Sequence, residues 1–295
     1  MTSFRVWHIS GANVGLGLQL ALKALHEGDK VVAAVRSPDK VPETLKVPAV
    51  KVLQFDLSWS QERMNEYAKV AFESFGKIDV LVNNAGYAYM GAIEETDPLA
   101  EYRDSAVKQQ FDTNVFAMLR IIRAMLPRLR AQGSGYIMNL SSIGGFRGVQ
   151  SNGVYCATKF AVEAVTEALS VEVAPFGLHC VIVEPGYFRT SFLSNPASGA
   201  NVAAPLAAYE GTPAHEARKN FEKYNGRQPG DPVQGAARMW EYVAGEGLFS
   251  GKKKLLRLPL GTDCGTAMRK HSADLAETAD HYEDIWKSTD FPSGS

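Results

Sequence analysis

Apolar residues along this chain fall into two repeating patterns. Short, strand-sized apolar runs carry no polar residue at alternate positions, which is typical of parallel strands covered on both faces. Longer segments with apolar residues every three or four positions, typical of helices, separate these runs. This order predicts an α/β fold with a doubly wound parallel sheet whose strands end at one common edge. The expected strands are Val6–Ser10, Lys30–Val35, Val50–Phe55, Val80–Val82, Tyr136–Leu140 and His179–Val183.

The regular alternation stops near Val183. Residues 190–231 are rich in Ala, Gly, Pro and Asn, and we interpret them as a lid-like insertion over the sheet edge rather than as a second domain. Helical character returns at Ala236–Val243, and a strand is expected at Lys254–Leu258, before a partly helical end at Ala267–Trp286. The pattern therefore predicts a single domain over residues 1–295.

Composition and charge exclude several classes of function. The 295 residues are 45% hydrophobic, and 31 basic against 32 acidic residues give a net charge of −1, so no global attraction draws the chain to nucleic acid or to an anionic membrane. No apolar run reaches the roughly 18 residues of a membrane span, and we read no secretory signal in the first residues. Cys156, Cys180 and Cys264 lie far apart, which argues against a disulfide framework and a structural metal site. We expect a cytoplasmic protein without a metal.

A glycine-rich loop connects the first expected strand to the first helix. It contains Gly11, Asn13, Gly15, Leu16 and Gly17. Glycines permit a tight turn and allow a pyrophosphate to approach the amides at a helix N-terminus. Three glycines alone could simply mark a turn. Their position between the first strand and first helix of an alternating chain favours dinucleotide binding.

The GxxxGxG spacing of this loop resembles that of the short-chain dehydrogenase/reductase family, and further motifs of that family follow in order over residues 4–190. The resemblance implies a Rossmann-like domain and an oxidoreductase that uses a nicotinamide cofactor. It also implies a cofactor half at about 1–140 and a catalytic and substrate half at about 141–290. The matching segments are Asn83-Asn84-Ala85-Gly86, Asn114, Ser142, Tyr155-Cys156-Ala157-Thr158-Lys159 and Pro185-Gly186-Tyr187-Phe188-Arg189-Thr190.

The end of the second strand predicts which nicotinamide cofactor is bound. Val35 stands where NAD-preferring members of the resembled family usually carry Asp, and Arg36 can hold a 2′-phosphate through charge-assisted hydrogen bonds. Ser37 can add a hydroxyl contact. We therefore expect NADP(H), with a solvated Arg36 as the alternative. The resemblance places Asp56 and Leu57 against the adenine ring, although Asp56 could instead cap a helix.

Two later segments are expected to complete the cofactor site. In the turn after the fourth strand, small residues let the backbone lie close to the cofactor. By resemblance, the turn after the sixth strand holds the nicotinamide carboxamide, although its threonine could equally cap a helix. The residues are Asn83, Ala85 and Gly86 in the first segment and Pro185, Gly186 and Thr190 in the second.

Tyr155 and Lys159 are the candidate acid–base pair. Reduction of a ketone adds a hydride to carbon and a proton to oxygen, so the site needs a proton donor and an oxyanion stabiliser. On a helix, a spacing of four puts both side chains on one face, where an ammonium group lowers the high pKa of a phenol. Alone, the pair would be interpreted as a surface contact.

Ser142 changes that interpretation because its distance before Tyr155 matches the family's catalytic serine, which polarises the substrate carbonyl. The resemblance also implies that Asn114 holds a water that connects Lys159 to solvent. The alternative is an amide satisfied inside a helix. The resemblance further implies that Lys159 holds the nicotinamide-ribose hydroxyls. We expect Ser141 to bond to local backbone.

The expected activity is NADP(H)-dependent hydride transfer to or from a carbonyl or alcohol carbon, with ketone reduction favoured. Segments expected around the site contain Phe146, Tyr187, Phe188 and Phe192, so a medium-sized, mostly apolar substrate fits best. The alternatives are an isomerase or cyclase on the same scaffold and a regulatory protein that binds NADP(H). By resemblance, we expect a homodimer or homotetramer formed through long helices at 101–131 and 154–174.

Overall fold

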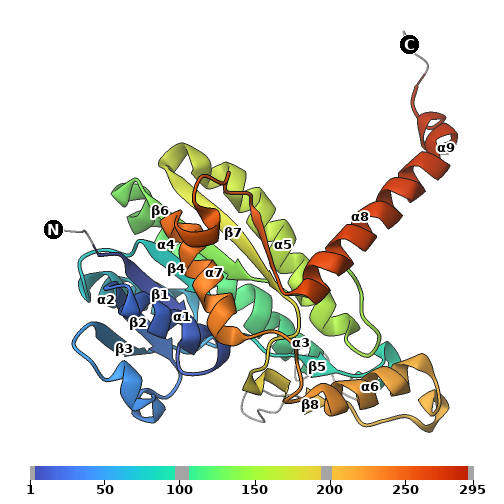
Figure 1. Ribbon diagram of the computed structural model, residues 1–295, viewed down its shortest axis with the longest axis horizontal. Coiled ribbons are helices and arrows are strands. Elements are labelled where there is room, and N and C mark those ends of the chain that lie inside the picture. Colours follow the sequence, from blue (N-terminus) through green and yellow to red (C-terminus); the bar gives the residue numbers. More distant parts are fainter. Residues whose placement is uncertain (1–3, 97–105, 194–200, 292–295) are drawn as a thin grey trace.

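The computed structural model describes residues 4–96, 106–193 and 201–291, and strands and helices alternate through much of the chain (Figure 1). The strands are β1 Val6–Ser10, β2 Lys30–Val35, β3 Val50–Gln54, β4 Val80–Asn83, β5 Tyr89–Met90, β6 Gly135–Leu140, β7 Leu178–Pro185, β8 Asn201–Val202 and β9 Arg257–Leu260. The helices are α1 Gly15–His26, α2 Gln61–Glu73, α3 Ala106–Phe111, α4 Ala117–Gln132, α5 Gly153–Val173, α6 Pro213–Tyr224, α7 Pro232–Ala244, α8 Thr262–His281 and α9 Glu283–Lys287.

A seven-stranded sheet in the order β3-β2-β1-β4-β6-β7-β9 forms the centre, and all its strand pairs are parallel. From β1 the chain builds outward to β3, and from β4 it builds outward the other way to β9. The strand order therefore reverses between β1 and β4, which confirms the predicted doubly wound, Rossmann-like sheet. Ligands bind at the carboxyl ends of the strands beside such a reversal.

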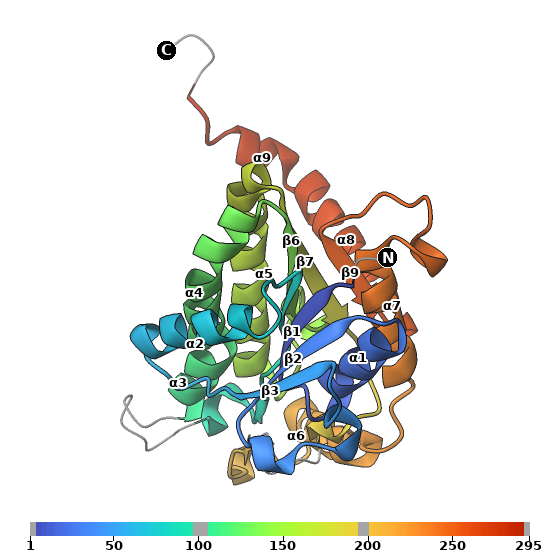
Figure 2. The ribbon, with the colours of Figure 1, turned by 90° about the vertical axis from the view of Figure 1, so that its left-hand side faces the viewer.

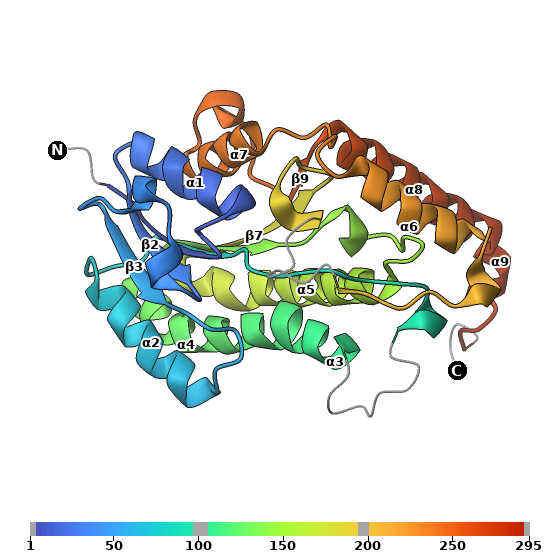
Figure 3. The ribbon, with the colours of Figure 1, turned by 90° about the horizontal axis from the view of Figure 1, so that it is seen from below.

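Helices cover both faces of the sheet (Figure 2, Figure 3). α1 and α7 lie on one face, and α2, α4 and α5 lie on the other. Successive strand residues point to opposite faces. Trp7 and Ile9 of β1 therefore pack with α1 and α7, whereas Val6 packs with the second group of helices. Burial on both faces explains why the strand sequences are apolar without alternation.

Asp29, in the turn between α1 and β2, joins distant parts of the first face. Its carboxylate is 4% exposed and accepts hydrogen bonds from the indole N–H of Trp7 at 2.8 Å and of Trp240 in α7 at 2.9 Å. The backbone N–H of Arg5 donates to it at 2.8 Å. These donors satisfy the buried charge, and they tie α7 to the first strand.

Local sequence sets several helix ends. The Ser60 side chain accepts from the N–H of Arg63 and caps α2, and the Asp231 side chain, followed by Pro232, caps α7. Gly133 ends α4 with φ 74, a left-handed conformation that costs glycine little.

Two elements differ from the expected pattern. The last strand is β9, Arg257–Leu260, and the prediction of Lys254–Leu258 is displaced: Lys254 precedes the strand and donates to the carbonyl of Val243 at 2.9 Å. Of the helix expected at 101–131, residues 101–105 lie outside the described residues, and a π-helical turn, Asp112–Phe116, separates α3 from α4. π-helical turns are rare and frequently occur at functional sites.

The described part of the 190–231 segment packs beside the strand C-terminal ends. β8 pairs with β5 in a separate parallel pair of strands. In α6, Phe221 packs with Ala88, Met90 and Tyr155. This segment therefore contributes apolar surface to the same edge of the sheet.

α8 projects from the body of the molecule (Figure 1), and its buried residues, Cys264 and Ala267, lie near its start. Within the described residues, no helix combines the length and the apolar character that a membrane crossing requires. In the same part of the chain, no three His, Cys, Asp or Glu side chains are grouped so that they could hold a metal ion.

Candidate active site

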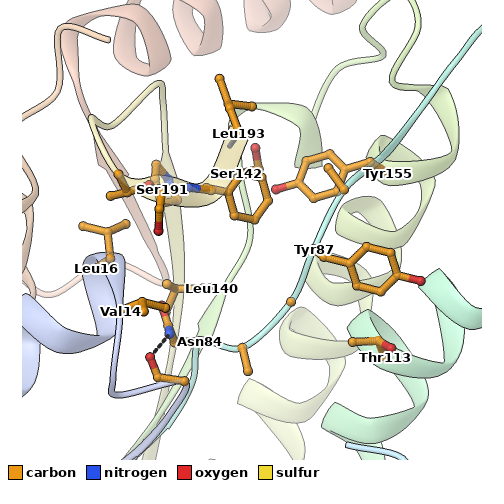
Figure 4. Close-up of a pocket in the computed structure, with 18 of the residues that line it drawn as sticks. Val14, Leu16, Asn84, Tyr87, Thr113, Leu140, Ser142, Tyr155, Ser191 and Leu193 are labelled. Atoms are coloured by element: carbon orange, nitrogen blue, oxygen red, sulfur yellow. Dashed lines mark hydrogen bonds between the residues drawn. The ribbon is translucent and has the colours of Figure 1, made fainter. Parts of the chain in front are cut away.

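A cavity of about 880 Å³ opens at the sheet edge where β1, β2, β6 and β7 end, and Figure 4 shows side chains that surround it. Its volume is within the roughly 300–1,000 Å³ of small-molecule and cofactor sites. Most residues predicted for the site line this cavity: Gly11, Asn13, Gly15, Leu16, Arg36, Ser37, Asp56, Leu57, Ala85, Gly86, Ser142, Tyr155, Lys159, Pro185, Gly186 and Thr190.

Three predicted residues lie outside this lining. Gly17 is in the first turn of α1. Asn83 and Asn114 line a smaller cavity of about 10 Å³ that Lys159 also borders. This volume is roughly that needed to hold one water. Asn83 also cross-links β4 to β6, because its side-chain N–H donates to Oδ1 of Asn139 at 2.7 Å.

The glycine-rich loop brings the first amides of α1 to the cavity. The N-cap residue, Val14, has no side-chain hydrogen bond to offer them, and the first turn has no acidic residue. Gly11 and Gly15 have φ values of 68 and 57, where a side chain would be strained. The N–H groups and the helix dipole therefore favour a negatively charged group at this end.

Asn84 fixes this loop, although it was not among the residues predicted for the site. Its side-chain N–H donates to the carbonyl of Ser10 at 2.8 Å, and its backbone N–H donates to the Ser10 hydroxyl at 3.0 Å. A Cβ added to Gly17 would lie 2.5 Å from both Asn84 Nδ2 and the carbonyl oxygen of Gly11. Asn84 and Gly17 together therefore fix how closely the loop approaches β4. The doubled asparagine of the motif was the signal that could have identified Asn84.

The end of β2 presents cationic side chains to the cavity. Val35 is buried, Arg36 is exposed, and Ser37 follows it. Lys40, in the 3-10 turn Pro38–Lys40, also lines the cavity and was not predicted. The structure thus places two positive charges after the second strand at the cavity wall, whereas Asp39 between them is not among the lining residues.

Asp56 and Leu57 follow β3 and reach the cavity, but Asp56 is not a helix cap. Its Oδ1 accepts from the backbone N–H of Ser58 at 2.9 Å and from the Ser58 hydroxyl at 2.7 Å. Because Ser60 caps α2, the capping interpretation of Asp56 is wrong.

Ser142 and Tyr155 lie close together in the cavity (Figure 4). Ser142 follows β6, and its hydroxyl oxygen accepts from the N–H of Gly144 at 3.1 Å. Tyr155, in the first turn of α5, is 8% exposed. Burial raises the pKa of the Tyr155 phenol above its ordinary value, and the neighbouring Ser142 hydroxyl lowers the pKa in part. The phenol is therefore protonated at neutral pH.

Lys159 lies one helical turn after Tyr155. Its Nζ is 5.6 Å from the centre of the Tyr155 ring and donates to the carbonyl of Leu140 at 2.7 Å. Burial lowers the pKa of Lys159 to about 8, and the negative charge of Glu163 opposes this shift. Most of the Lys159 population is therefore still charged at neutral pH.

Asn114 lies in the π-helical turn and is 4% exposed. Its side-chain nitrogen donates to the Tyr87 carbonyl at 2.9 Å and to the Thr158 hydroxyl at 3.0 Å, and its Oδ1 accepts from the Tyr87 N–H at 3.1 Å. A Cβ added to Gly86 would lie 3.0 Å from Asn114 Oδ1 and 3.8 Å from Lys159 Nζ. Both polar groups therefore converge on Gly86.

Thr190 caps a 3-10 turn, Ser191–Leu193, because its hydroxyl oxygen accepts from the N–H of Phe192 at 3.3 Å. The same side chain faces the glycine-rich loop, since a Cβ added to Gly15 would lie 3.5 Å from Thr190 Cβ. Thr190 therefore caps a helical turn and also lines the cavity beside the glycine-rich loop.

Two buried polar residues beside the site were missed in the sequence. Gln228 lines the cavity at 1% exposure, and its amide atoms have no hydrogen-bond partner among the described residues. Glu163 accepts from the Ser141 hydroxyl at 2.6 Å, so the expected backbone bond of Ser141 is wrong. No local pattern marks Gln228 or Glu163, because each reaches the site only through the folded chain.

Residues 5–200 match the family model described as short chain dehydrogenase. The chain belongs to the short-chain dehydrogenase family. Oxidoreductase BOA17 of Botryotinia fuckeliana is 31% identical over 291 residues, which cover 98% of this short-chain dehydrogenase and 99% of BOA17. The protein in a crystal structure of a short-chain dehydrogenase from Streptomyces avermitilis is 32% identical to this chain. The two structures match with a TM-score of 0.85 over 98% of this chain and 100% of that one.

This short-chain dehydrogenase is therefore an oxidoreductase, as its motifs predicted. More distant members share the fold with either nicotinamide cofactor bound. A Burkholderia cenocepacia enzyme in complex with NADP is 21% identical with a TM-score of 0.68 and covers 95% of this chain and 97% of its own. A Burkholderia phymatum enzyme in complex with NAD is 23% identical with a TM-score of 0.71, and the match covers 99% of this chain and 98% of that one.

Proposed function

We propose that this short-chain dehydrogenase is an NADP(H)-dependent enzyme that transfers a hydride between the nicotinamide and the carbonyl or alcohol carbon of a medium-sized, mostly apolar substrate, with ketone reduction as its direction. The observation that carries the proposal is that Ser142, Tyr155 and Lys159 line one cavity, with Lys159 one helical turn after Tyr155 and its Nζ 5.6 Å from the centre of the Tyr155 ring. Together they offer a proton donor, an oxygen-binding hydroxyl and a positive charge, which carbonyl reduction requires.

Each of the three side chains has a distinct role in this proposal. When bound, the reduced nicotinamide supplies the hydride. Tyr155, kept protonated by burial, donates its proton to the substrate oxygen, and Ser142 binds the same oxygen. The ammonium group of Lys159 then stabilises the phenolate left on Tyr155. Lys159 also holds the ribose hydroxyls.

The small cavity between Asn83, Asn114 and Lys159 supports the proposed proton path. Its volume of about 10 Å³ suits one water, and polar side chains border it. Oδ1 of Asn114 has a further acceptor site beyond the Tyr87 N–H. We assign Asn114 the role of holding this water, which replaces from solvent the proton that Lys159 passes on to the Tyr155 phenolate.

The residues around the large cavity fit a dinucleotide. The uncapped start of α1, with glycines at positive φ and no acidic residue in its first turn, suits a pyrophosphate. At the end of β2, Arg36 and Lys40 suit the additional 2′-phosphate of NADP(H), which a carboxylate there would repel. The proposed contacts are Gly11, Asn13, Gly15, Leu16 and Gly17 for the pyrophosphate, Asp56 and Leu57 for the adenine, and Asn83, Ala85, Gly86, Pro185, Gly186 and Thr190 for the nicotinamide half.

Apolar side chains around Tyr155 support the proposed substrate class. Met90, Tyr187 and Phe221 cluster with Tyr155, and Phe192 lies 6.1 Å from it between ring centres. All of these side chains also line the cavity. Their shape and polarity favour a neutral, apolar body that carries one carbonyl group.

Three further features belong to the same proposal. The 190–231 segment acts as a lid within one domain, because its described part packs on the site. Exposed apolar side chains on the π-helical turn and on α5 suit a homodimer or homotetramer: Phe116, Phe160 and Val171. Three buried, free thiols suit the reducing cytoplasm.

A panel of ketones and alcohols with both cofactors tests the reaction. We expect loss of NADPH absorbance with apolar ketones and much slower loss of NADH absorbance. Substrate conversion without net cofactor oxidation would instead indicate an isomerase or cyclase. Cofactor binding with no conversion across the panel would indicate a regulatory protein.

Arg36→Ala tests the cofactor preference. We expect NADPH to bind roughly 10- to 100-fold more weakly, as follows from about 1.5–3 kcal/mol for a charged hydrogen bond, and NADH binding to change little. Fluorescence titration of both cofactors measures this, with Arg63→Ala, an exposed arginine on α2, as the control. Equal losses for NADPH and NADH would contradict the assignment of Arg36.

A further inference from the structure

A cluster of charged side chains lies behind the catalytic loop. Arg257 of β9 forms ion pairs with Glu163 and Glu167 of α5 and with Glu184 of β7. Glu163 and Glu184 are 3% and 0% exposed, whereas the side chain of Glu167 is 51% exposed. One guanidinium group therefore faces three carboxylates, two of them buried in the core.

Glu163 connects this cluster to the site. On α5, Lys159 and Glu163 are one turn apart, and they hold two consecutive residues at the end of β6. Lys159 donates to the carbonyl of Leu140 at 2.7 Å, and the Ser141 hydroxyl donates to Glu163 at 2.6 Å. The next residue is Ser142. The position of the catalytic serine thus depends directly on these two side chains.

The loop after Ser142 also rests on Glu163. A Cβ added to Gly145 would lie 2.0 Å from Glu163 Oε1 and 2.1 Å from the Ser141 hydroxyl. Only a residue without a side chain allows the Ser142–Gly145 turn to lie this close to the carboxylate. The contact therefore fixes the distance between this loop and α5.

The charge of Glu163 acts on Lys159 as well. Burial lowers the pKa of Lys159, and Glu163 is the charged group that opposes this. Around Glu163 itself, the charged and titratable groups are Arg257, Glu184 and Glu167, and the thiol of Cys264 interacts with it electrostatically. Burial and the charge of Glu163 raise the pKa of Glu184 to about 7. Because Arg257 neutralises only part of the carboxylate charge, a negative potential remains near Lys159.

We propose that Glu163, held by Arg257, is a positioning residue that orients the Ser141–Ser142 segment and keeps Lys159 in its ammonium form. This inference rests on the proposed reductase function, in which Lys159 must be charged when Tyr155 gives up its proton. Arg257 supplies the counter-charge that makes a buried carboxylate tolerable at this place.

Glu163→Gln tests the inference because it keeps the shape and removes the charge. We expect the pKa of Lys159 to fall by roughly one unit, as for loss of a nearby opposite charge, and kcat for ketone reduction to decrease about tenfold at alkaline pH, where both proteins lose the Lys159 charge, with KM little changed. The alkaline limb of the kcat profile should move to lower pH by the same amount. Glu167→Gln is the matched control, because Glu167 shares Arg257 but does not contact Ser141.

Direct titration of Lys159 separates this inference from the reductase proposal. NMR of lysine-labelled protein, with the Lys159 signal identified by its loss in Lys159→Met, needs neither cofactor nor substrate. An unchanged Lys159 pKa in folded Glu163→Gln, or an equal shift in Glu167→Gln, overturns the role of Glu163. A wild-type protein that oxidises no NADPH with any ketone overturns the reductase proposal instead.

If Glu163→Gln does not fold, Ser141→Ala provides a second test, because it removes the hydrogen bond to Glu163 and keeps the charge. This variant should lower kcat without moving the alkaline limb of the kcat profile. An unchanged kcat then overturns the inference.

Discussion

The hydroxyl group of Tyr155 is the proposed proton donor for the substrate oxygen. Tyr155→Phe removes that hydroxyl and keeps the ring that packs with Met90 and Phe221. We expect turnover to fall by at least about 10², the lower range for loss of a general acid, while NADPH binds as tightly as before. Single-turnover kinetics and a binding titration measure both quantities. Near-normal turnover in this variant would falsify the assignment of the proton donor.

Individual residues divide into those that the sequence could reveal and those that it could not. Ser142, Tyr155 and Lys159 were predictable because fixed spacings mark them, and the structure brings them together in one cavity. Glu163 was not, because its partner Arg257 lies in the last strand of the sheet. The side-chain amide of Gln228, which has no hydrogen-bond partner in the described part of the chain, was equally invisible, since no pattern in the sequence around it marks such a side chain.

At the scale of elements, the junction of β1 and α1 has no spare volume. Gly17→Ala would place a methyl group 2.5 Å from the carbonyl oxygen of Gly11, so backbone must shift. We expect the free energy of unfolding to drop by about 1–3 kcal/mol, the usual cost of overpacking, and NADPH to bind more weakly. Urea denaturation and cofactor titration measure the two effects.

Gly265→Ala in α8 is the matched control for Gly17→Ala. An added Cβ at Gly265 meets no atom within 4 Å, and the residue is helical. This variant should be as stable as the wild type or more stable by up to about 1 kcal/mol, the helix preference of Ala over Gly. Similar losses in both variants would mean that the tight contact at Gly17 is unimportant.

Element types were easier to predict than irregularities within them. Burial on both faces makes parallel strands visible as apolar runs, and six such runs became strands of the sheet. The π-helical turn Asp112–Phe116 left no signal, because apolar residues at helical spacing, Phe111, Val115 and Met118, continue through it. β9 was displaced because Lys254 and Leu255 look like the start of a strand, yet Lys254 bonds to α7 instead.

Across the whole molecule, buried His8 should make the fold sensitive to acid. His8 is 0% exposed, its Nε2 lies 2.8 Å from the Tyr67 hydroxyl, and burial lowers its pKa from 6.5 to about 4. Below pH 6.5 the unfolded chain takes up a proton that the folded chain refuses until about pH 4. The contribution of neutral His8 to the free energy of unfolding is therefore complete above pH 6.5. It is lost as the pH falls to about 4, and the loss amounts to at most roughly 3 kcal/mol.

His8→Gln should flatten the dependence of unfolding free energy on pH between 4 and 6.5, even if the variant is less stable at neutral pH. Urea denaturation at several pH values measures the slope. The exposed His179 is the control, since His179→Gln should leave the slope as it is in the wild type. A slope that His8→Gln leaves unchanged would show that another group controls acid stability.

The carboxylate of Asp29 also bears on how the protein is made. Trp240, one of its donors, is 211 positions later in the chain, and Trp240 packs with α1. As the protein emerges from the ribosome, β1, α1 and β2 appear long before this partner exists. Until α7 arrives, the apolar side of α1 and a carboxylate destined for the interior face water. A nascent chain that ends at residue 200, the limit of the family match, is therefore exposed to aggregation and depends on prompt completion or on a chaperone.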